Sequence, residues 1–145
     1  MEVTLNSLNE ARSYALAIES ALQRSSIVEL EINAQQLLDA LVADLRTVHA
    51  RVHIMDRRPH DDASELHGLY EPVTDVRPYG RIFVWTRTAK RDKLVAYKTF
   101  LRTLLHEFCH HLDYEHFRFS ESFHTAGFFR RENSLYRQLS AVADR

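Results

Sequence analysis

The chain has 145 residues, of which 45 % are hydrophobic and 27 % are charged, and its formal net charge is −1. These values are ordinary for a soluble globular protein, so we expect one domain over residues 1–145, and the net charge argues neither for nor against a polyanionic partner. One cysteine excludes an internal disulfide or a cysteine-based zinc ribbon and favours a cytoplasmic location, and because no segment approaches about 20 consecutive apolar residues we expect neither a secretory signal nor a membrane span.

The N-terminal part of the chain is predicted to be mostly helical. Ser7 and Glu10 have the spacing of a capping box, and apolar residues follow at helical intervals, so a helix is expected over about 8–23. Residues 27–32, IVELEI, alternate apolar and acidic side chains, which favours a short strand. Asn33 is then expected to cap a second helix.

The middle of the chain contains the segments that favour a sheet. ARVHIMD (50–56) is expected to be a strand, and LHGLYEP (66–72) and RIFVWTR (81–87) are expected to be two more extended segments. RRPHDDASE (57–65), with its proline and paired acids, is expected to be a loop. With helices on either side, this pattern predicts an α+β fold in which a small mixed sheet of three to four strands packs on helices.

The most informative segment is an apolar helix expected over about 92–113, with Asp92 as its N-cap. It contains the pattern H-E-x-x-H, from His106 to His110. Residues four apart lie one turn apart on the same helix face, so the two imidazoles can bind one small ion, and zinc suits nitrogen ligands. Glu107 is rotated about 100° from His106, so we expect it to stay outside the ligand set and to take a proton from a metal-bound water. A charged turn at a helix end is the simpler alternative, but unpaired charges are costly to bury in so apolar a helix.

A third ligand is expected, because catalytic zinc usually has three protein ligands and one open position. His116 stands where the metzincin pattern H-E-x-x-H-x-x-G-x-x-H has its third histidine, but Asp113 replaces the glycine of that pattern. His124 is the favoured candidate. We expect it in the first turn of a further helix capped by Ser120 or Ser122, where the helix dipole favours the neutral ring that a metal requires.

The run LLHEFCHHLDYEHF…SFHTAGFF resembles the SprT-like zinc metalloproteases, a group that includes the Spartan proteases. Members of this group carry H-E-x-x-H on one helix, and their third histidine opens the next helix in an H-G-x-x-F or similar motif. Here that motif is HTAGF (124–128), with threonine in place of the first glycine, and the resemblance covers roughly 81–130.

This resemblance implies a zincin-like fold and a site of known composition. It implies that Glu107 is the general base and that zinc is bound by His106, His110 and His124. It also implies that RIFVWTR is the edge strand over the cleft, where it would pair with an extended substrate. Many members add a cysteine-rich module for nucleic acid, which a chain with one cysteine cannot form.

Three further side chains near the pattern have two interpretations each. Asp113 could hold the second nitrogen of a histidine ligand, or it could be a solvated acid at the helix end. Tyr136 could stabilise an oxyanion, but we favour a packing role. His111 points away from the ligand face and is expected to take no part.

The expected function is hydrolysis of peptide bonds in a protein or peptide substrate, with zinc as cofactor. Manganese or iron could also occupy a histidine site. Two alternatives stay open: a DNA-associated protease of the Spartan type, and a zinc-binding module without catalysis. The DNA alternative draws on basic residues over 77–93 and on Arg130, Arg131 and Arg137, for which a solvated surface is the favoured interpretation.

Overall fold

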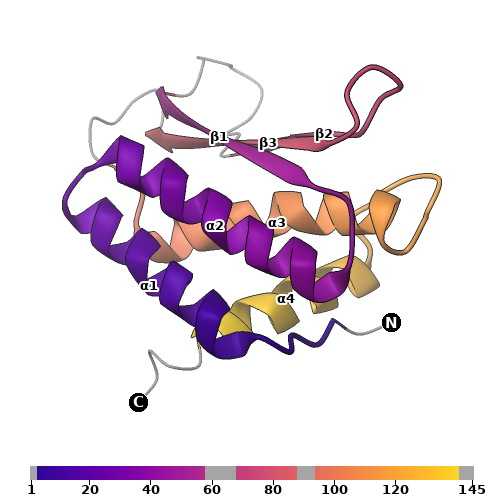
Figure 1. Ribbon diagram of the computed structural model, residues 1–145, viewed down its shortest axis with the longest axis horizontal. Coiled ribbons are helices and arrows are strands. Elements are labelled where there is room, and N and C mark those ends of the chain that lie inside the picture. The colour runs from indigo at the N-terminus through magenta and orange to yellow at the C-terminus, as the bar shows by residue number, and fades with distance from the viewer. Residues whose placement is uncertain (1–2, 58–67, 88–93, 141–145) are drawn as a thin grey trace.

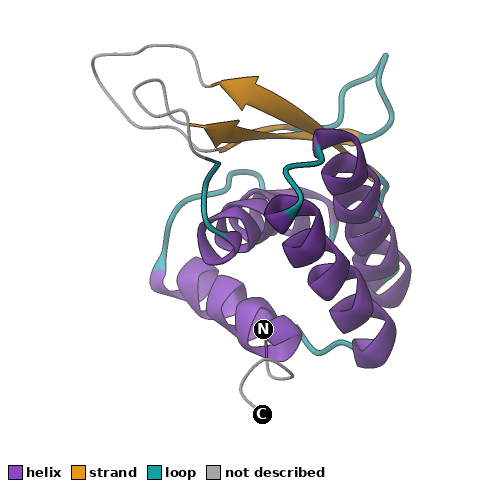
Figure 2. Ribbon diagram, turned by 90° about the vertical axis from the view of Figure 1, so that its left-hand side faces the viewer, coloured by secondary structure: helices purple, strands orange, loops and turns teal. Residues whose placement is uncertain are grey.

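The computed structural model describes residues 3–57, 68–87 and 94–140. The described chain forms, in order, α1 (Leu8–Gln23), α2 (Ile27–Leu45), β1 (Ala50–Arg57), β2 (Gly68–Glu71), β3 (Gly80–Arg87), α3 (Tyr97–Glu115) and α4 (Ala126–Ser140). This confirms the predicted α+β class. The sheet lies on α2 and α3, and α1 and α4 lie beneath them (Figure 1, Figure 2). None of the described helices combines the length and the apolar character that a membrane crossing requires.

The three strands form one mixed sheet in the order β1-β3-β2, with β1 parallel and β2 antiparallel to β3. Along β3, buried residues alternate with half-buried ones, and Ile82 and Val84 are buried in the core together with apolar residues of the helices. β3 is therefore the central strand, so the expectation that RIFVWTR forms the edge over the cleft is wrong. The order is set by packing and not by the pattern of β3 itself: β3 pairs with β1 on one side and with the four-residue β2 on the other, and β2 takes the edge beside α3.

The strand expected over 27–32 does not form, because these residues are the first two turns of α2. The hydroxyl of Ser26 caps this helix by accepting a hydrogen bond from the backbone N–H three residues on. Asn33 lies inside the helix rather than at its start. Leu30 begins the buried face and is 1 % exposed, whereas Val28 is 72 % exposed. The apolar residues of this segment therefore follow a helical period and only resemble strand alternation over a short window.

The other helix starts agree with the sequence in part. α1 spans the predicted 8–23, but the Ser7 side chain makes no capping hydrogen bond. α3 begins at Tyr97 because the preceding residues are extended, and the backbone N–H of Val95 donates to a carbonyl oxygen of β3. Asp92, the expected N-cap, lies outside the described residues, as does almost all of the predicted loop at 57–65.

Helix α3 is the centre of the core. Its buried apolar side chains are Phe100, Leu101, Leu104, Leu105, Phe108, Cys109 and Leu112. Burying a leucine or phenylalanine stabilises a fold by about 1.5–3 kcal/mol relative to leaving it exposed, so this face fixes the helix against the sheet and the other helices. The polar residues His106 and His110 are only partly buried and lie where the core opens.

Candidate metal centre

The three histidines predicted to bind a metal lie together. Nε2 of His124 is 3.1 Å from Nε2 of His106 and 3.0 Å from Nε2 of His110. One ligand atom from each ring lies within 4.8 Å of the others. Two nitrogens bound to one tetrahedral zinc, each at about 2.0–2.1 Å, are separated by about 3.3 Å. The rings therefore need only small adjustments to bind one ion.

The third histidine is placed by the segment that precedes α4. His124 stands two residues before that helix begins, and the hydroxyl of Thr125 caps the helix by accepting from the N–H of Phe128 at 3.1 Å. The prediction that Ser120 or Ser122 caps the helix is therefore wrong, and so is the placement of the histidine in the first helical turn. The cap still fixes the backbone next to the imidazole.

The alternative third ligand is not part of the cluster. His116 is the C-cap residue of α3, and its ring packs against Phe117 with centroids 4.9 Å apart. Because α3 continues to Glu115, the residue after it points away from the first imidazole of the H-E-x-x-H pattern.

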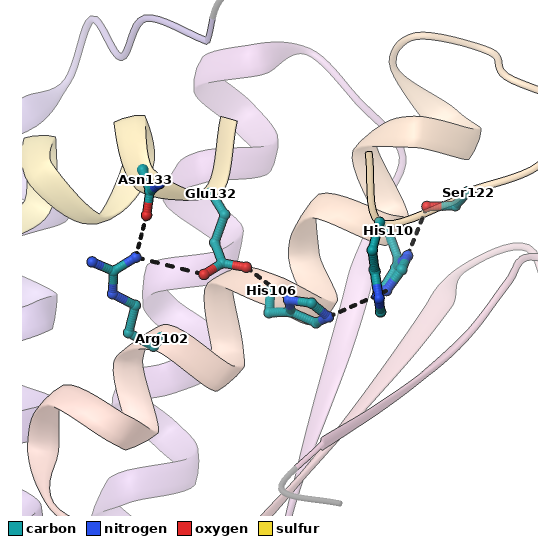
Figure 3. A network of polar contacts seen from close by, with 7 residues as sticks. Arg102, His106, His110, Ser122, Glu132 and Asn133 are labelled. Carbon is teal, nitrogen blue, oxygen red and sulfur yellow. Dashed lines mark hydrogen bonds and ion pairs between the residues drawn. The ribbon is translucent and has the colours of Figure 1, made fainter. Parts of the chain in front are cut away.

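A carboxylate fixes the orientation of the first histidine (Figure 3). Oε1 of Glu132 lies 2.7 Å from Nδ1 of His106. A carboxylate only accepts hydrogen bonds, so the imidazole donates from Nδ1, and the neutral ring keeps its lone pair on Nε2, toward the cluster. Arg102 lies 3.6 Å from the second oxygen of Glu132 and also donates to Asn133.

Two side chains in series, Ser122 and Asp113, fix the orientation of His110. Its Nδ1 lies 2.6 Å from Oγ of Ser122, which lies 2.6 Å from Oδ2 of Asp113. Since the carboxylate must accept, the serine hydroxyl donates to it and in turn accepts from the Nδ1–H of the histidine. Asp113 thus contacts the histidine through Ser122. At 1 % exposure, and paired with Arg131 at 2.9 Å, it is not a solvated acid at the helix end.

Neither Glu132 nor this role of Ser122 is among the predictions from the sequence. A signal for the glutamate was present: His124, Phe128 and Glu132 are spaced four residues apart, which places the phenylalanine and the glutamate on one face of α4. Phe128 packs within 5.1 Å, centroid to centroid, of the rings of all three clustered histidines. Glu132 is the one acid within α4, and which imidazole it meets depends on how α3 and α4 pack.

Glu107 lies beside the cluster and outside it. It is 8 % exposed and lines a cavity of about 380 Å³ together with the three histidines. A Cβ atom at Gly68 would lie 3.0 Å from the carboxylate oxygen Oε2, so glycine allows β2 to approach this closely. Burial is the main cause that raises the pKa of Glu107, to about 7; the charge of Glu132 adds to it, and that of His106 opposes it. A buried carboxylate of this kind is a stronger base than an exposed one.

The remaining sequence candidates lie away from the cavity or have structural partners. Tyr136 packs against the core, and the Arg102 guanidinium lies 3.9 Å from its ring centroid, which agrees with a packing role. His111 is off the ligand face, as expected, but it is fully buried and hydrogen-bonded. Among the arginines considered for nucleic acid, Arg77 and Arg81 pair with Glu71. The alternative of a nucleic-acid partner stays open.

The centre offers three imidazole nitrogens and one free carboxylate in a single cavity. Comparison of the chain with protein-family models, with curated proteins and with solved structures finds no match. The chemistry of the centre is therefore argued from its own residues and distances.

We expect Glu132→Ala to raise the dissociation constant for zinc by about 10–100-fold, because His106 loses the acceptor that fixes its tautomer and orientation. Competition with a chromophoric chelator measures this change. Glu121→Ala is the matched control, since Glu121 is exposed. Equal affinities in the two variants would contradict the role given to Glu132.

Proposed function

We propose that this protein is a zinc-dependent peptidase of the zincin type, as its resemblance to the SprT-like proteases implies. The observation that supports this most directly is the convergence of His106, His110 and His124 next to a separate buried carboxylate, Glu107. Nitrogen ligands without a carboxylate favour zinc over magnesium or calcium. An acid left free beside such a site is what hydrolysis by an activated water requires.

The reaction divides between the metal and the chain. A zinc ion, when bound, supplies Lewis-acid chemistry, which polarises a carbonyl group and lowers the pKa of a water. Glu107 accepts the proton that this water loses and later passes it to the nitrogen of the departing amine. Glu132 and Ser122 keep His106 and His110 in the tautomer that offers Nε2.

The substrate is proposed to be an extended peptide segment bound along β2. In the sheet order β1-β3-β2, no described strand pairs with the outer edge of β2. Gly68, Leu69 and Tyr70 of this strand line the cavity that contains Glu107. A peptide that adds to this edge by main-chain hydrogen bonds would pass directly over the histidines.

Removal of the metal tests this proposal. We expect the zinc-loaded protein to contain one zinc per chain and to cut reduced, carboxymethylated casein. Dialysis against a chelator is expected to abolish cutting, and one equivalent of zinc is expected to restore it. Elemental analysis and gel electrophoresis measure the two results. A chain that binds zinc and never cuts would support the binding-module alternative, and a chain that binds no metal would overturn the proposal.

A further inference from the structure

One end of the cavity beside the histidines is apolar. It is formed by Tyr70 of β2, by Pro72 after that strand, and by Tyr114, one turn beyond His110 on α3. The rings of the two tyrosines are nearly parallel, at 15°, with centroids 6.3 Å apart. The two tyrosine rings and the proline ring together form an apolar wall within reach of the candidate metal centre.

The wall is fixed in place through Tyr70. Its hydroxyl lies 2.6 Å from Nδ1 of His111, and Nε2 of His111 lies 2.6 Å from the carbonyl oxygen of Val48. The carbonyl can only accept, so His111 donates from Nε2 and its Nδ1 accepts from the phenol. His111 has no exposed surface. The phenol group is therefore engaged on the core side, and the ring offers its apolar surface to the cavity.

Close packing against β3 further restricts the positions of Tyr70 and His111. A Cβ atom at Gly80 of β3 would lie 2.6 Å from both the Tyr70 hydroxyl oxygen and Nδ1 of His111, closer than real Cβ atoms approach. Backbone and side chains thus surround the phenol on the sheet side as well as on the helix side. A wall held in this way is preorganised, and preorganised surfaces lose little entropy on binding.

We propose that Tyr70, Pro72 and Tyr114 form a substrate pocket that selects a large apolar side chain, aromatic or long aliphatic, next to the bond that is cut. Cutting rests on the proposed function, whereas side-chain selection is a binding property and can be measured without it. Every second side chain of an extended peptide on β2 would face the cavity, so the pocket can take one of them.

The charges around the pocket favour an apolar occupant. Among the described residues that line the whole cavity, Glu107 is the only acid, and no lysine or arginine lines it. An acidic side chain would be repelled by the Glu107 carboxylate and would find no lysine or arginine, while a basic one would find no carboxylate beyond the proposed base. Aromatic side chains, in contrast, gain from contact with parallel tyrosine rings.

Peptide binding to the full-length Glu107→Gln protein loaded with zinc tests the pocket directly. The probes are fluorescent octapeptides of serine and alanine in which one phenylalanine moves along the positions. We expect the best phenylalanine peptide to bind at least about tenfold more tightly than the all-alanine parent. This difference should disappear in a second background carrying Tyr114→Ala and persist with Tyr114→Phe, which keeps the ring.

Zinc content checks that each variant is folded. Should Tyr114→Ala fail to bind zinc, Pro72→Asp serves instead, because Pro72 is exposed and lines the pocket; this substitution should also remove the preference. No preference for phenylalanine at any position, no peptide binding at all, or a preference that survives both substitutions would overturn the pocket. If phenylalanine peptides bind preferentially but the unsubstituted protein cuts no peptide, the pocket stands and the peptidase proposal fails. If the protein cuts peptides without this binding preference, the peptidase proposal stands and the pocket fails.

Discussion

Replacing Glu107 with glutamine is expected to lower kcat/KM for peptide hydrolysis by at least about 10²–10⁴-fold, the usual contribution of a general base. Glutamine has nearly the same shape, so it preserves the contact with Gly68 and the cavity beside the histidines. It cannot accept a proton from water. Zinc content should stay at one per chain, because Glu107 lies outside the cluster of ligand atoms. The rates come from a quenched fluorescent peptide at saturating zinc.

The melting temperature of the zinc-free protein shows whether the loss of activity in Glu107→Gln is caused by loss of folding. Burial raises the pKa of Glu107 to about 7, so the charged form is disfavoured in the folded state. Above the unfolded pKa the wild-type side chain therefore destabilises the zinc-free fold, and below it, where both states are protonated, it does not. We expect Glu107→Gln to raise the Tm of the zinc-free protein at pH 8 and to leave it unchanged at pH 4.

The matched control is Glu10→Gln on α1, an exposed glutamate far from the cavity in sequence and on another helix. Its hydrolysis rate should equal that of the unsubstituted protein. If Glu107→Gln cut at the wild-type rate, Glu107 would not be the base. If Glu107→Gln lost zinc as well as activity, the carboxylate would be a metal ligand, and its assignment as a base outside the ligand set would be wrong.

Local periodicity predicted the parts of the fold that a single element determines. β1, β3 and α1 were recognised because their patterns extend over a full strand or helix. IVELEI at 27–32 was misread because six residues do not distinguish alternation from a helical period. The buried face of α2 becomes visible only when Leu30 is read together with Leu37 and Leu41 further along.

The parts that were missed depend on how elements pack together. Strand order is a tertiary property, so the sequence could not say that β2, and not β3, forms the edge beside α3. The histidine pair needs one helix and was found from its spacing. Glu132 and Ser122 reach that pair from α4 and the preceding segment, so no local pattern links them to it.

The choice of third ligand gives the largest expected effect on metal binding. We expect His124→Ala to weaken zinc binding by more than about 100-fold, since loss of a direct ligand should exceed the 10–100-fold effect of losing a partner that only orients one. His106 and His110 alone leave two nitrogens, which is one fewer than catalytic zinc sites use. His116→Ala is expected to bind zinc as the unsubstituted protein does, because its ring packs against Phe117.

Both variants remove one imidazole within the same stretch of chain, so the comparison cancels general effects of losing a histidine. Elemental analysis after gel filtration, followed by a competition titration, gives stoichiometry and affinity for each. Circular dichroism of the zinc-free proteins checks that the helices are retained. Strong metal loss in His116→Ala with normal binding in His124→Ala would contradict this choice. It would mean that the end of α3 rearranges so that His116, and not His124, is the third ligand.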